Sequence, residues 1–326
     1  MIKHKEKIIN FSLDFLRKNG PLVVLVSLFL FSCAAFGSRF FQLINITNLL
    51  RQISISGLAA IGINFVIISG GRDLSVGAIC AVCGMIMAIL SPFGFFPAII
   101  GGLVTGAAFG LLNGIIITKF GIPPFITTLG TQLGARGVAL LMNRELSIPV
   151  DETKRSITFI GRGFVFDMPV PVIIFIVALI IAYIISTRTR LGRAFYAIGG
   201  NEESAVMMGI RIDRTKILVY IISGVCTALA AIVLTARLGA GIPVAGEGWD
   251  MTIMATVIIG GTLIRGGVGD MRGVLVGTLI CGIINNMINM FGNISTYWQN
   301  IIYGLLLLVA VIMQTYSASH QALKKT

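Results

Sequence analysis

The chain has 326 residues, of which 56% are hydrophobic and only 12% are charged, and its mean hydropathy is +0.95. Soluble domains carry about 25% charged residues, so this composition excludes an ordinary water-soluble globule and leaves lipid as the solvent that fits. The formal net charge of +12 is scattered between apolar runs, whereas a nucleic-acid-binding protein gathers its basic residues on one face. We therefore expect a protein embedded in the lipid bilayer, with no nucleic acid as a partner.

Runs of about 20 apolar residues with few charges predict helices that span the membrane. In chain order, ten such runs occupy approximately residues 22–37, 53–70, 75–91, 97–118, 124–143, 169–187, 216–236, 250–264, 273–291 and 297–315. The eighth run is short for a spanning helix. The predicted fold is all-α: a polytopic transmembrane helical bundle of about ten spans within residues 21–316, between an N-terminal segment at 1–20 and a C-terminal tail at 317–326.

The lysines and arginines orient this bundle. With the N-terminus inside the cell, the inside segments collect 17 of the 25 basic residues and the outside segments seven, while Arg136 falls within the fifth span. Because cytoplasmic loops carry the excess of Lys and Arg, both termini are predicted to be cytoplasmic. The charges on the outer side that are candidates for docking a partner are Arg39, Arg144, Arg237, Glu247 and Asp250.

The cysteines and histidines do not predict a metal site. All five cysteines lie within apolar runs, including Cys80 and Cys83, whose C-x-x-C spacing also occurs in zinc and redox sites. We interpret them as small, soft residues on a helix in lipid. His4 and His320 lie near opposite ends of the chain. A membrane-embedded enzyme needs a nucleophile with a base or a metal cluster, and the scattered acids and these residues supply neither.

The longest predicted inside loop, residues 188–216, contains the signals of one short helix. Asn201 stands at the N-cap position, and Glu202 and Glu203 follow in the first turn, where acidic side chains are favourable. Apolar residues come next, and Gly209 stands where a glycine ends a helix. A helix of about two turns is not stable alone. We expect it to be presented to the cytoplasm and held by a partner.

This loop also carries a family resemblance. Its sequence TRLGRAFYAIGGNEESAVMMGI resembles the cytoplasmic coupling loop of ABC importer permeases of the ribose and galactose type. Three further stretches are similar to motifs of the same family, in the same order: ISGGRDLSVGAI, GIPPFITTLG…RGV and IIGGTLIRGGVGDMRG. Together they cover roughly residues 20 to 315. Arg72 stands where the family usually has an aliphatic residue, and Arg265 and Asp270 make the last motif more charged than is common.

The resemblance implies the non-catalytic permease subunit of an ABC importer for a monosaccharide or a similar small polyol, in the bacterial inner membrane. The implied partners are ABC ATPase subunits, a second permease copy or a paralogue, and an extracytoplasmic sugar-binding protein. ATP and Mg would be used by the ATPase, because this chain lacks the G-x-x-x-x-G-K-[ST] phosphate loop, and no cofactor is expected on the chain. The residues assigned to ATPase coupling are Asn201, Glu202, Glu203, Ser204, Ala205, Met208 and Gly209.

Uncharged polar residues inside the spans predict the pathway of the solute. The candidates are Asn64, Asn113, Phe125, Thr127, Thr128, Gln132, Asn285, Asn286 and Asn289. Most of these groups donate and accept hydrogen bonds, which suits a neutral polyhydroxylated solute. No acidic residue is expected at mid-span, which argues against coupling to protons or sodium. The alternative role for each residue is a hydrogen bond between helices.

Two further positions are predicted to be structural or to serve gating. Arg136 lies near the middle of the fifth span, where a bare charge is costly, so it should pair with carbonyls or a polar side chain and brace the helix. Gly70 and Gly71 precede Arg72 and Asp73 at the cytoplasmic edge of the second span. They predict a broken or sharply turned helix. The alternative is an ordinary turn with a local ion pair.

One rival function remains open, and the sequence argues against a second. An ATP-independent secondary carrier or facilitator would transport the solute without any ATPase, and the capped helix at 201–209 would then be coincidental. An exporter permease normally carries a fused ATPase or long cytoplasmic helices, neither of which the sequence shows.

Overall fold

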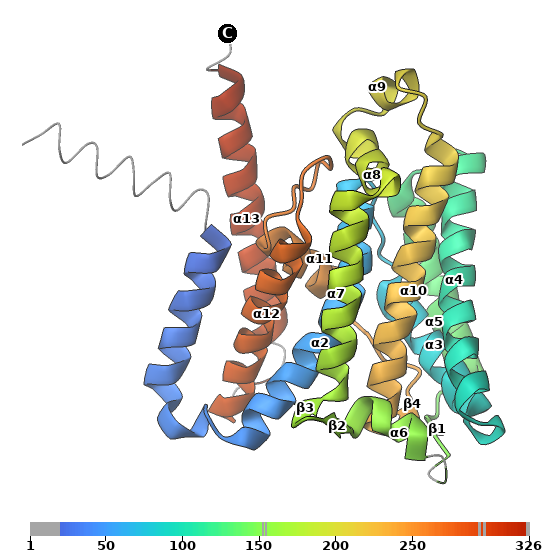
Figure 1. Cartoon of the computed structure of the whole chain (residues 1–326), viewed down its shortest axis with the longest axis vertical. Coiled ribbons are helices and arrows are strands. Elements are labelled where there is room, and N and C mark those ends of the chain that lie inside the picture. The colour runs from blue at the N-terminus through green and yellow to red at the C-terminus, as the bar shows by residue number, and fades with distance from the viewer. Residues whose placement is uncertain (1–19, 152, 154, 293–294, 296–297, 324–326) are drawn as a thin grey trace, which may run out of the picture.

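The computed structural model describes residues 20–151, 153, 155–292, 295 and 298–323 (Figure 1). A first helix covers residues 20–36. The elements that follow are η1 Gly37–Arg39, α2 Leu43–Ile68, α3 Val76–Leu90, η2 Ser91–Phe93, α4 Phe95–Lys119, α5 Pro124–Leu141, β1 Ile148–Pro149, α6 Arg155–Arg162, β2 Phe164–Val165, β3 Met168–Pro169, α7 Val170–Arg188, α8 Arg190–Gly200, α9 Glu202–Met207, α10 Ile212–Leu238, β4 Ala240–Gly241, α11 Trp249–Ile259, α12 Met271–Phe291 and α13 Trp298–Leu323.

The predicted all-α membrane fold is confirmed. Among the described residues, seven helices are long and apolar enough to cross a membrane. The other three predicted spans correspond to α5, α11 and α13. At 1.5 Å per residue, the 11 residues of α11 reach only about 16 Å, roughly half of the hydrocarbon thickness. The count of ten spans and the side on which the termini lie stay predictions.

One helix boundary differs clearly from the prediction, and two short helices were not predicted. The second helix begins at Leu43, not near residue 53, so Arg51 lies within α2 and not in an outer segment. The reason is that the polar pair Arg51–Gln52 interrupts the apolar run, although the backbone stays helical. Helices α6 and α8 were missed because both are short and mixed in polarity. Most of the predicted segment 1–20 and the last three residues of the predicted tail lie outside the described residues.

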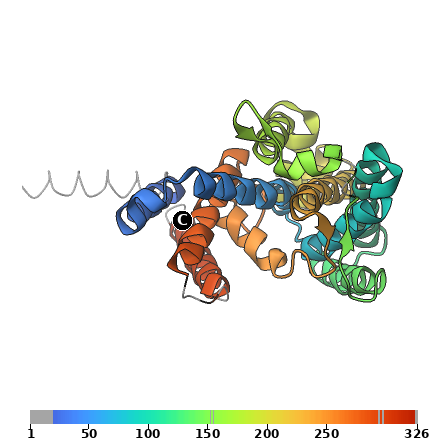
Figure 2. The same ribbon diagram turned by 90° about the horizontal axis from the view of Figure 1, so that it is seen from below.

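The centre of the bundle is the crossing of α2 and α10 (Figures 1 and 2). At Gly62 of α2, a side chain would lie 2.8 Å from the Cα atom of Ser223 of α10. Helix α4 packs on the other side of α10, and a Cβ atom on Gly106 would collide with the carbonyl oxygen of Gly224. Small residues allow backbones to approach closely in lipid. The backbones of α4 and α10 therefore pack closely at this glycine.

Helices α3 and α11 are each preceded by a non-helical segment that enters the bundle. Gly70, with φ +80°, turns the chain after α2, and residues 71–75 lead inward to α3. Gly239, with φ +78°, turns it after α10, and residues 240–248 run back along α3. Gly241 lies against the carbonyl oxygen of Gly84, and Gly246 lies against Gly77 near the start of α3. The first turns of α3 and α11 therefore meet inside the bundle.

The two ends of the bundle differ in structure (Figure 1). At one end, which we call the coupling end, α8 lies at the end of α7, and α9 lies beyond the ends of α7 and α10. At the other, which we call the hairpin end, α6 lies beside two small antiparallel sheets. Strand β1 pairs with β4, with Ile148 opposite Gly241, and β2 pairs with β3, with Val165 opposite Met168. Both sheets have strands of two residues only, so they fix loops and do not alter the fold class.

Candidate functional site

Helix α9 has the ends that its sequence predicts. The side chain of Asn201 accepts a hydrogen bond of 2.7 Å from the backbone N–H of Ser204. At the other end Gly209 has φ +78°, and its N–H donates to Val206 O at 2.9 Å, while Ile210 N donates to Ala205 O at 3.1 Å. This pair of bonds is the Schellman arrangement, in which a left-handed glycine closes the last turn. The prediction of a short capped helix is confirmed.

One side of α9 is apolar and faces away from the protein. Ala205 is fully buried, whereas Val206, Met207 and Met208 are 57%, 89% and 65% exposed. The helix is held to α10 by an ion pair of 2.7 Å between Glu202 and Lys216. Exposed methionines adapt to different partner surfaces, so this side is suited to contact with another protein. Met207, the most exposed of the three, was not among the predicted contact residues.

Backbone contacts connect α8 to the turns that follow α2 and α11. A side chain on Gly199 would collide with the carbonyl oxygen of Ile68, and that oxygen accepts a hydrogen bond of 2.8 Å from Gly267 N. Gly266 lies against Gly70, with 2.8 Å to its Cα atom from a built Cβ. We call these four glycines, Gly70, Gly199, Gly266 and Gly267, the glycine junction. It brings three of the four sequence motifs together, and it leaves no side chain to absorb a movement of α8.

Tyr196 of α8 adds a side-chain link to the same place. Its hydroxyl donates to Gly269 O at 2.8 Å and lies 2.9 Å from Ser186 Oγ. Burial raises the pKa of Tyr196, and the carboxylate of Asp270 acts in the same direction. The hydroxyl therefore stays protonated and able to donate at neutral pH.

Asp73 lies inside the bundle and not at its edge, which corrects the prediction. Only 3% of it is exposed. Its Oδ1 accepts hydrogen bonds from the N–H and the hydroxyl of Ser75, at 3.0 and 2.5 Å, and its Oδ2 accepts one from Ser223 of α10 at 2.9 Å. The neighbouring Arg72 is exposed and makes no ion pair among the described residues. Asp73 lies in the segment between α2 and α3 and not within a helix, so the prediction that no acidic residue lies at mid-span stays a prediction.

The hydrogen bonds of Asp73 continue through the predicted pathway residue Asn113. Its amide donates to Ser75 Oγ at 3.0 Å, and its carbonyl accepts from Thr131 at 2.6 Å. The series from Ser223 to Thr131 links α10, the start of α3, α4 and α5. A buried network of this kind fixes the relative positions of the helices that contribute to it.

Two other predicted pathway asparagines are also bonded within the chain. Asn64 accepts from Thr262 at 2.7 Å and donates to the sulfur of Met271 at 3.3 Å. Asn286 and Asn45 exchange bonds of 2.6 and 3.3 Å between α12 and α2. These contacts correspond to the alternative role, hydrogen bonding between helices. The assignment of Asn64, Asn113 and Asn286 to a pathway stays a prediction, with their polar atoms engaged in this conformation.

The remaining pathway candidates lie on two helices that stand apart. On α5, Phe125 is 46% exposed, Thr127 has a buried hydroxyl without a partner among the described residues, and Thr128 bonds to Pro124 O of its own helix at 2.8 Å. On α12, Asn289 is exposed and Asn285 has a buried, unpartnered Oδ1. Figures 1 and 2 show α5 and α12 in different parts of the bundle. One chain does not bring these residues into a single site.

Arg136 of α5 pairs with carbonyl groups, which is one of the two partners expected for it. Its Nη1 donates to Pro243 O at 2.6 Å and to Ala245 O at 2.9 Å. Both carbonyls belong to the segment that enters the bundle before α11. The bonds tie α5 to the start of α11, and they bring the guanidinium close to the carboxylates of Glu247 and Asp250.

These charged groups and the neutral Gln132 lie on one outward side of the chain. We call this side the α5–α11 face and define it by Gln132, Arg136, Glu247 and Asp250. Glu247 is exposed and the other three are half-buried. Their level is inside the bundle, because neighbouring Gly246 contacts Gly77 near the start of α3. Charges at that depth do not face lipid but a protein or a water-filled space. Glu247 and Asp250 were predicted as docking charges on the outer side, which no observation here tests. The interrupted, glycine-rich run GAGIPVAGEG before a short apolar helix is the signal in the sequence for a segment that enters the bundle.

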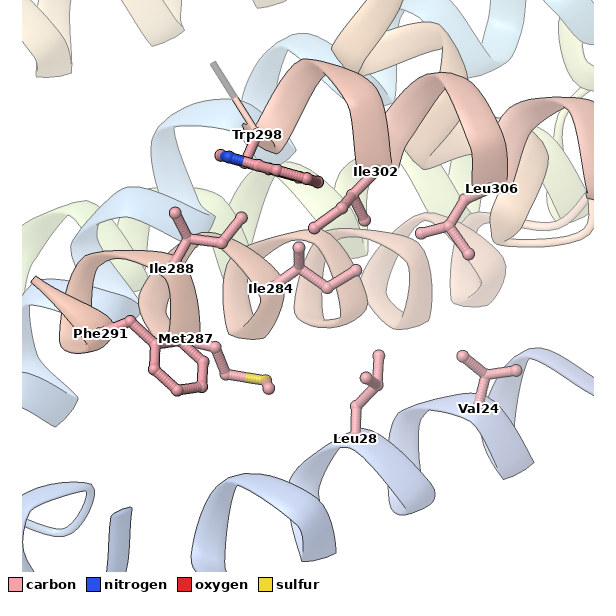
Figure 3. A pocket seen from close by; sticks show the side chains of 9 residues that line it. All are labelled: Val24, Leu28, Ile284, Met287, Ile288, Phe291, Trp298, Ile302 and Leu306. Carbon is pink, nitrogen blue, oxygen red and sulfur yellow. The ribbon is translucent and has the colours of Figure 1, made fainter. Parts of the chain in front are cut away.

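The apolar groove in Figure 3 has different chemistry. It has a volume of about 300 Å³ and lies between the first helix and the pair α12 and α13. Its lining is entirely apolar: Val24, Leu28, Ile284, Met287, Ile288, Phe291, Trp298, Ile302 and Leu306. A hydrophilic solute would lose its hydrogen bonds with water there without replacement. The groove therefore matches the chemistry of lipid and not that of a polar cargo.

Comparison with known proteins agrees with the sequence resemblance. Residues 45–311 match the family described as branched-chain amino acid transport system / permease component. The chain is 38% identical over 320 residues to the ribose import permease protein RbsC of Bacillus subtilis (strain 168), covering 96% of this chain and 97% of the relative.

Two more relatives come from Escherichia coli (strain K12). The D-allose transport system permease protein AlsC is 40% identical over 318 residues, which is 95% of this chain and 94% of the relative. The L-arabinose transport system permease protein AraH is 35% identical over 299 residues, which is 91% and 90%. No solved structure matches the chain. The chain is thus a multi-pass membrane protein that belongs to the branched-chain amino acid transport system / permease component family.

Proposed function

We propose that the chain is the permease subunit of an ABC importer that carries a monosaccharide, or a similar small neutral polyol, into the cell. Energy comes from ATP hydrolysis on a separate ATPase subunit, and an extracytoplasmic sugar-binding protein delivers the solute. The observation that carries this proposal is α9, a capped helix with exposed methionines. It is connected to the bundle through α8, which contributes Gly199 to the glycine junction. Relatives that import ribose, allose and arabinose support the class of solute.

The coupling residues act as a contact surface for the ATPase. Asn201 and Gly209 fix the ends of α9, and Glu202 anchors it to Lys216. Met207 and Met208 are left free to fill a cleft on the partner. A movement of α9 reaches the turn at Gly70 through α8, because the backbones touch at the glycine junction. ATP and Mg belong to the partner, and this chain supplies only the mechanical connection.

The pathway runs along the α5–α11 face, between this chain and a second permease copy or a paralogue. Gln132, Arg136, Glu247 and Asp250 are polar groups at a depth where lipid is unfavourable. Carboxylates accept hydrogen bonds from the hydroxyls of a neutral sugar, and guanidinium groups donate to them. Gly130, Gly134 and Gly137 of α5 have open space around them, which leaves room for a solute beside the helix.

Reconstitution in proteoliposomes tests the proposal. The chain is purified with its candidate ATPase, and binding proteins loaded with ribose, allose or arabinose are added on the extracytoplasmic side. We expect one loaded binding protein to stimulate ATP hydrolysis and to start sugar uptake. Uptake of the same sugar by the chain without any ATPase would contradict the proposal and identify a secondary carrier or facilitator.

A further inference from the structure

Three arginines from distant parts of the sequence meet at the hairpin end. Arg51 of α2 donates from Nη2 to the carbonyl oxygen of Arg162 at 2.7 Å. Arg162, the last residue of α6, donates from Nε to the carbonyl oxygen of Arg237 near the end of α10, also at 2.7 Å. We call these residues the arginine cluster. The carbonyl groups position the guanidinium groups but do not neutralise them.

The cluster lacks acidic partners within the described chain. The two ion pairs found there, Lys119 with Asp213 and Lys216 with Glu202, both lie at the coupling end. Among the residues that the structure describes, the buried Nε of Arg51 has no hydrogen-bond partner, and the charge of Arg51 is close enough to Arg237 to repel it. Held together without counter-ions, like charges raise the energy of the free chain. An anionic partner would lower it.

An exposed aromatic hairpin borders the cluster. The guanidinium carbon of Arg51 lies 4.7 Å from the ring centre of Phe164 on β2. The turn between β2 and β3 consists of Phe166 and Asp167, with φ +50° and +60°. A bulky residue is rare in this left-handed region, and the Phe166 ring is fully exposed. Strained backbone is typical of binding sites, and aromatic residues with arginine are enriched in protein interfaces.

We propose that the arginine cluster, with Phe164 and Phe166 as its rim, is the docking site for an acidic surface of the extracytoplasmic binding protein. The inference rests on the proposed function, which puts the hairpin end outside the cell. Carboxylates of the partner pair with Arg51 and Arg237, and the aromatic rim excludes water around them. A lipid phosphate offers one charged group, whereas three guanidinium groups on three separate elements match several carboxylates on one rigid protein surface.

The test uses the binding protein that stimulates ATP hydrolysis by the wild-type complex. Its affinity is measured for the whole transporter in nanodiscs of neutral lipid, at low and at high ionic strength. The variant is Arg237→Glu, because this side chain donates no hydrogen bond within the described chain. We expect a rise in Kd of about tenfold or more, as for other charge pairs at interfaces, and a weaker dependence on salt. Arg155→Glu is the matched control: it makes the same charge change at an exposed position outside the cluster, and its Kd should stay near that of the wild type.

Several results would overturn the inference. Equal Kd values and equal salt dependence for the wild type and Arg237→Glu, with the wild-type complex still stimulated, would remove the docking role but leave the proposed function intact. Equal losses in Arg237→Glu and Arg155→Glu would show a general effect of charge and not a site. A salt-dependent difference between the wild type and Arg237→Glu that arises only in anionic nanodiscs would assign the cluster to a lipid headgroup. If no binding protein stimulates the wild type, the proposed function itself fails.

Discussion

The coupling end and the hairpin end differ in whether their charged side chains are paired and in how closely their backbones pack. At the coupling end, Lys216 pairs with Glu202, and backbones touch at the glycine junction. At the hairpin end, Arg51 and Arg237 have no acidic partner among the described residues, and the turn at Phe166 is strained. An end that transmits movement needs rigid internal contacts. An end that binds and releases a soluble partner gains from charge that is satisfied only in the complex.

The largest effect on transport is expected at the glycine junction. In Gly199→Val, the new side chain meets the carbonyl oxygen of Ile68, and overpacking of this kind costs about 1–3 kcal/mol. We expect a lower melting temperature and loss of sugar-stimulated ATP hydrolysis in the reconstituted complex. The control is Gly200→Ala, where a new Cβ atom has open space. A normal ATPase rate in Gly199→Val would show that the contact does not transmit movement.

The next largest effect on transport is expected at Arg136, which ties α5 to the segment before α11. In Arg136→Leu, the carbonyl groups of Pro243 and Ala245 lose their donor. Loss of hydrogen bonds to a charged group costs about 1.5–3 kcal/mol, so we expect normal membrane insertion but uptake at least about tenfold lower. Uptake per inserted molecule is measured in proteoliposomes. Wild-type uptake would rule out a structural role for this arginine.

A change on the surface of α9 should separate coupling from stability. In Met207→Glu, a charge replaces a side chain that is 89% exposed, so folding should be unaffected. Burial of an unpaired charge in the ATPase cleft would cost several kcal/mol, and we expect weaker co-purification of the ATPase. Affinity for the binding protein at the hairpin end serves as the internal control and should not change. Intact ATPase binding would place the partner's contact elsewhere.

The smallest effect concerns Tyr196. Its hydrogen bond to Gly269 O is worth about 0.5–1.5 kcal/mol, which Tyr196→Phe should remove at neutral pH. Because the folded pKa is raised, the stabilisation is complete below the unfolded value of about 10 and is lost as the pH rises toward the folded value. Melting curves of the two proteins should therefore converge above pH 10. A constant difference across alkaline pH would contradict the role of the hydroxyl as donor.

Local features could be read from the sequence because their causes lie within a few residues. The cap at Asn201 and the end at Gly209 depend only on neighbouring backbone groups, so the sequence predicts α9 and the structure confirms it. The apolar runs likewise predict a membrane protein, because a helix that spans the lipid must consist mainly of apolar residues.

Other features depended on which segments lie side by side. Asp73 is buried because Ser223, far along the chain, supplies a hydroxyl to it. Asn64, a predicted pathway residue, finds its partner in Thr262. The arginine cluster is formed by residues of three helices, and the sequence of any one of these helices does not predict it.

Sequence alone therefore determined the lipid surroundings of this protein, its long apolar helices and the short capped helix α9. The tertiary structure decided that α3 and α11 meet inside the bundle, that Asp73 is buried and that Arg51 and Arg237 come together. The physical reason is the separation along the chain between the groups that interact. Hydrophobicity and capping act within one element, whereas hydrogen bonds and charge–charge contacts act between atoms that only the folded chain brings close.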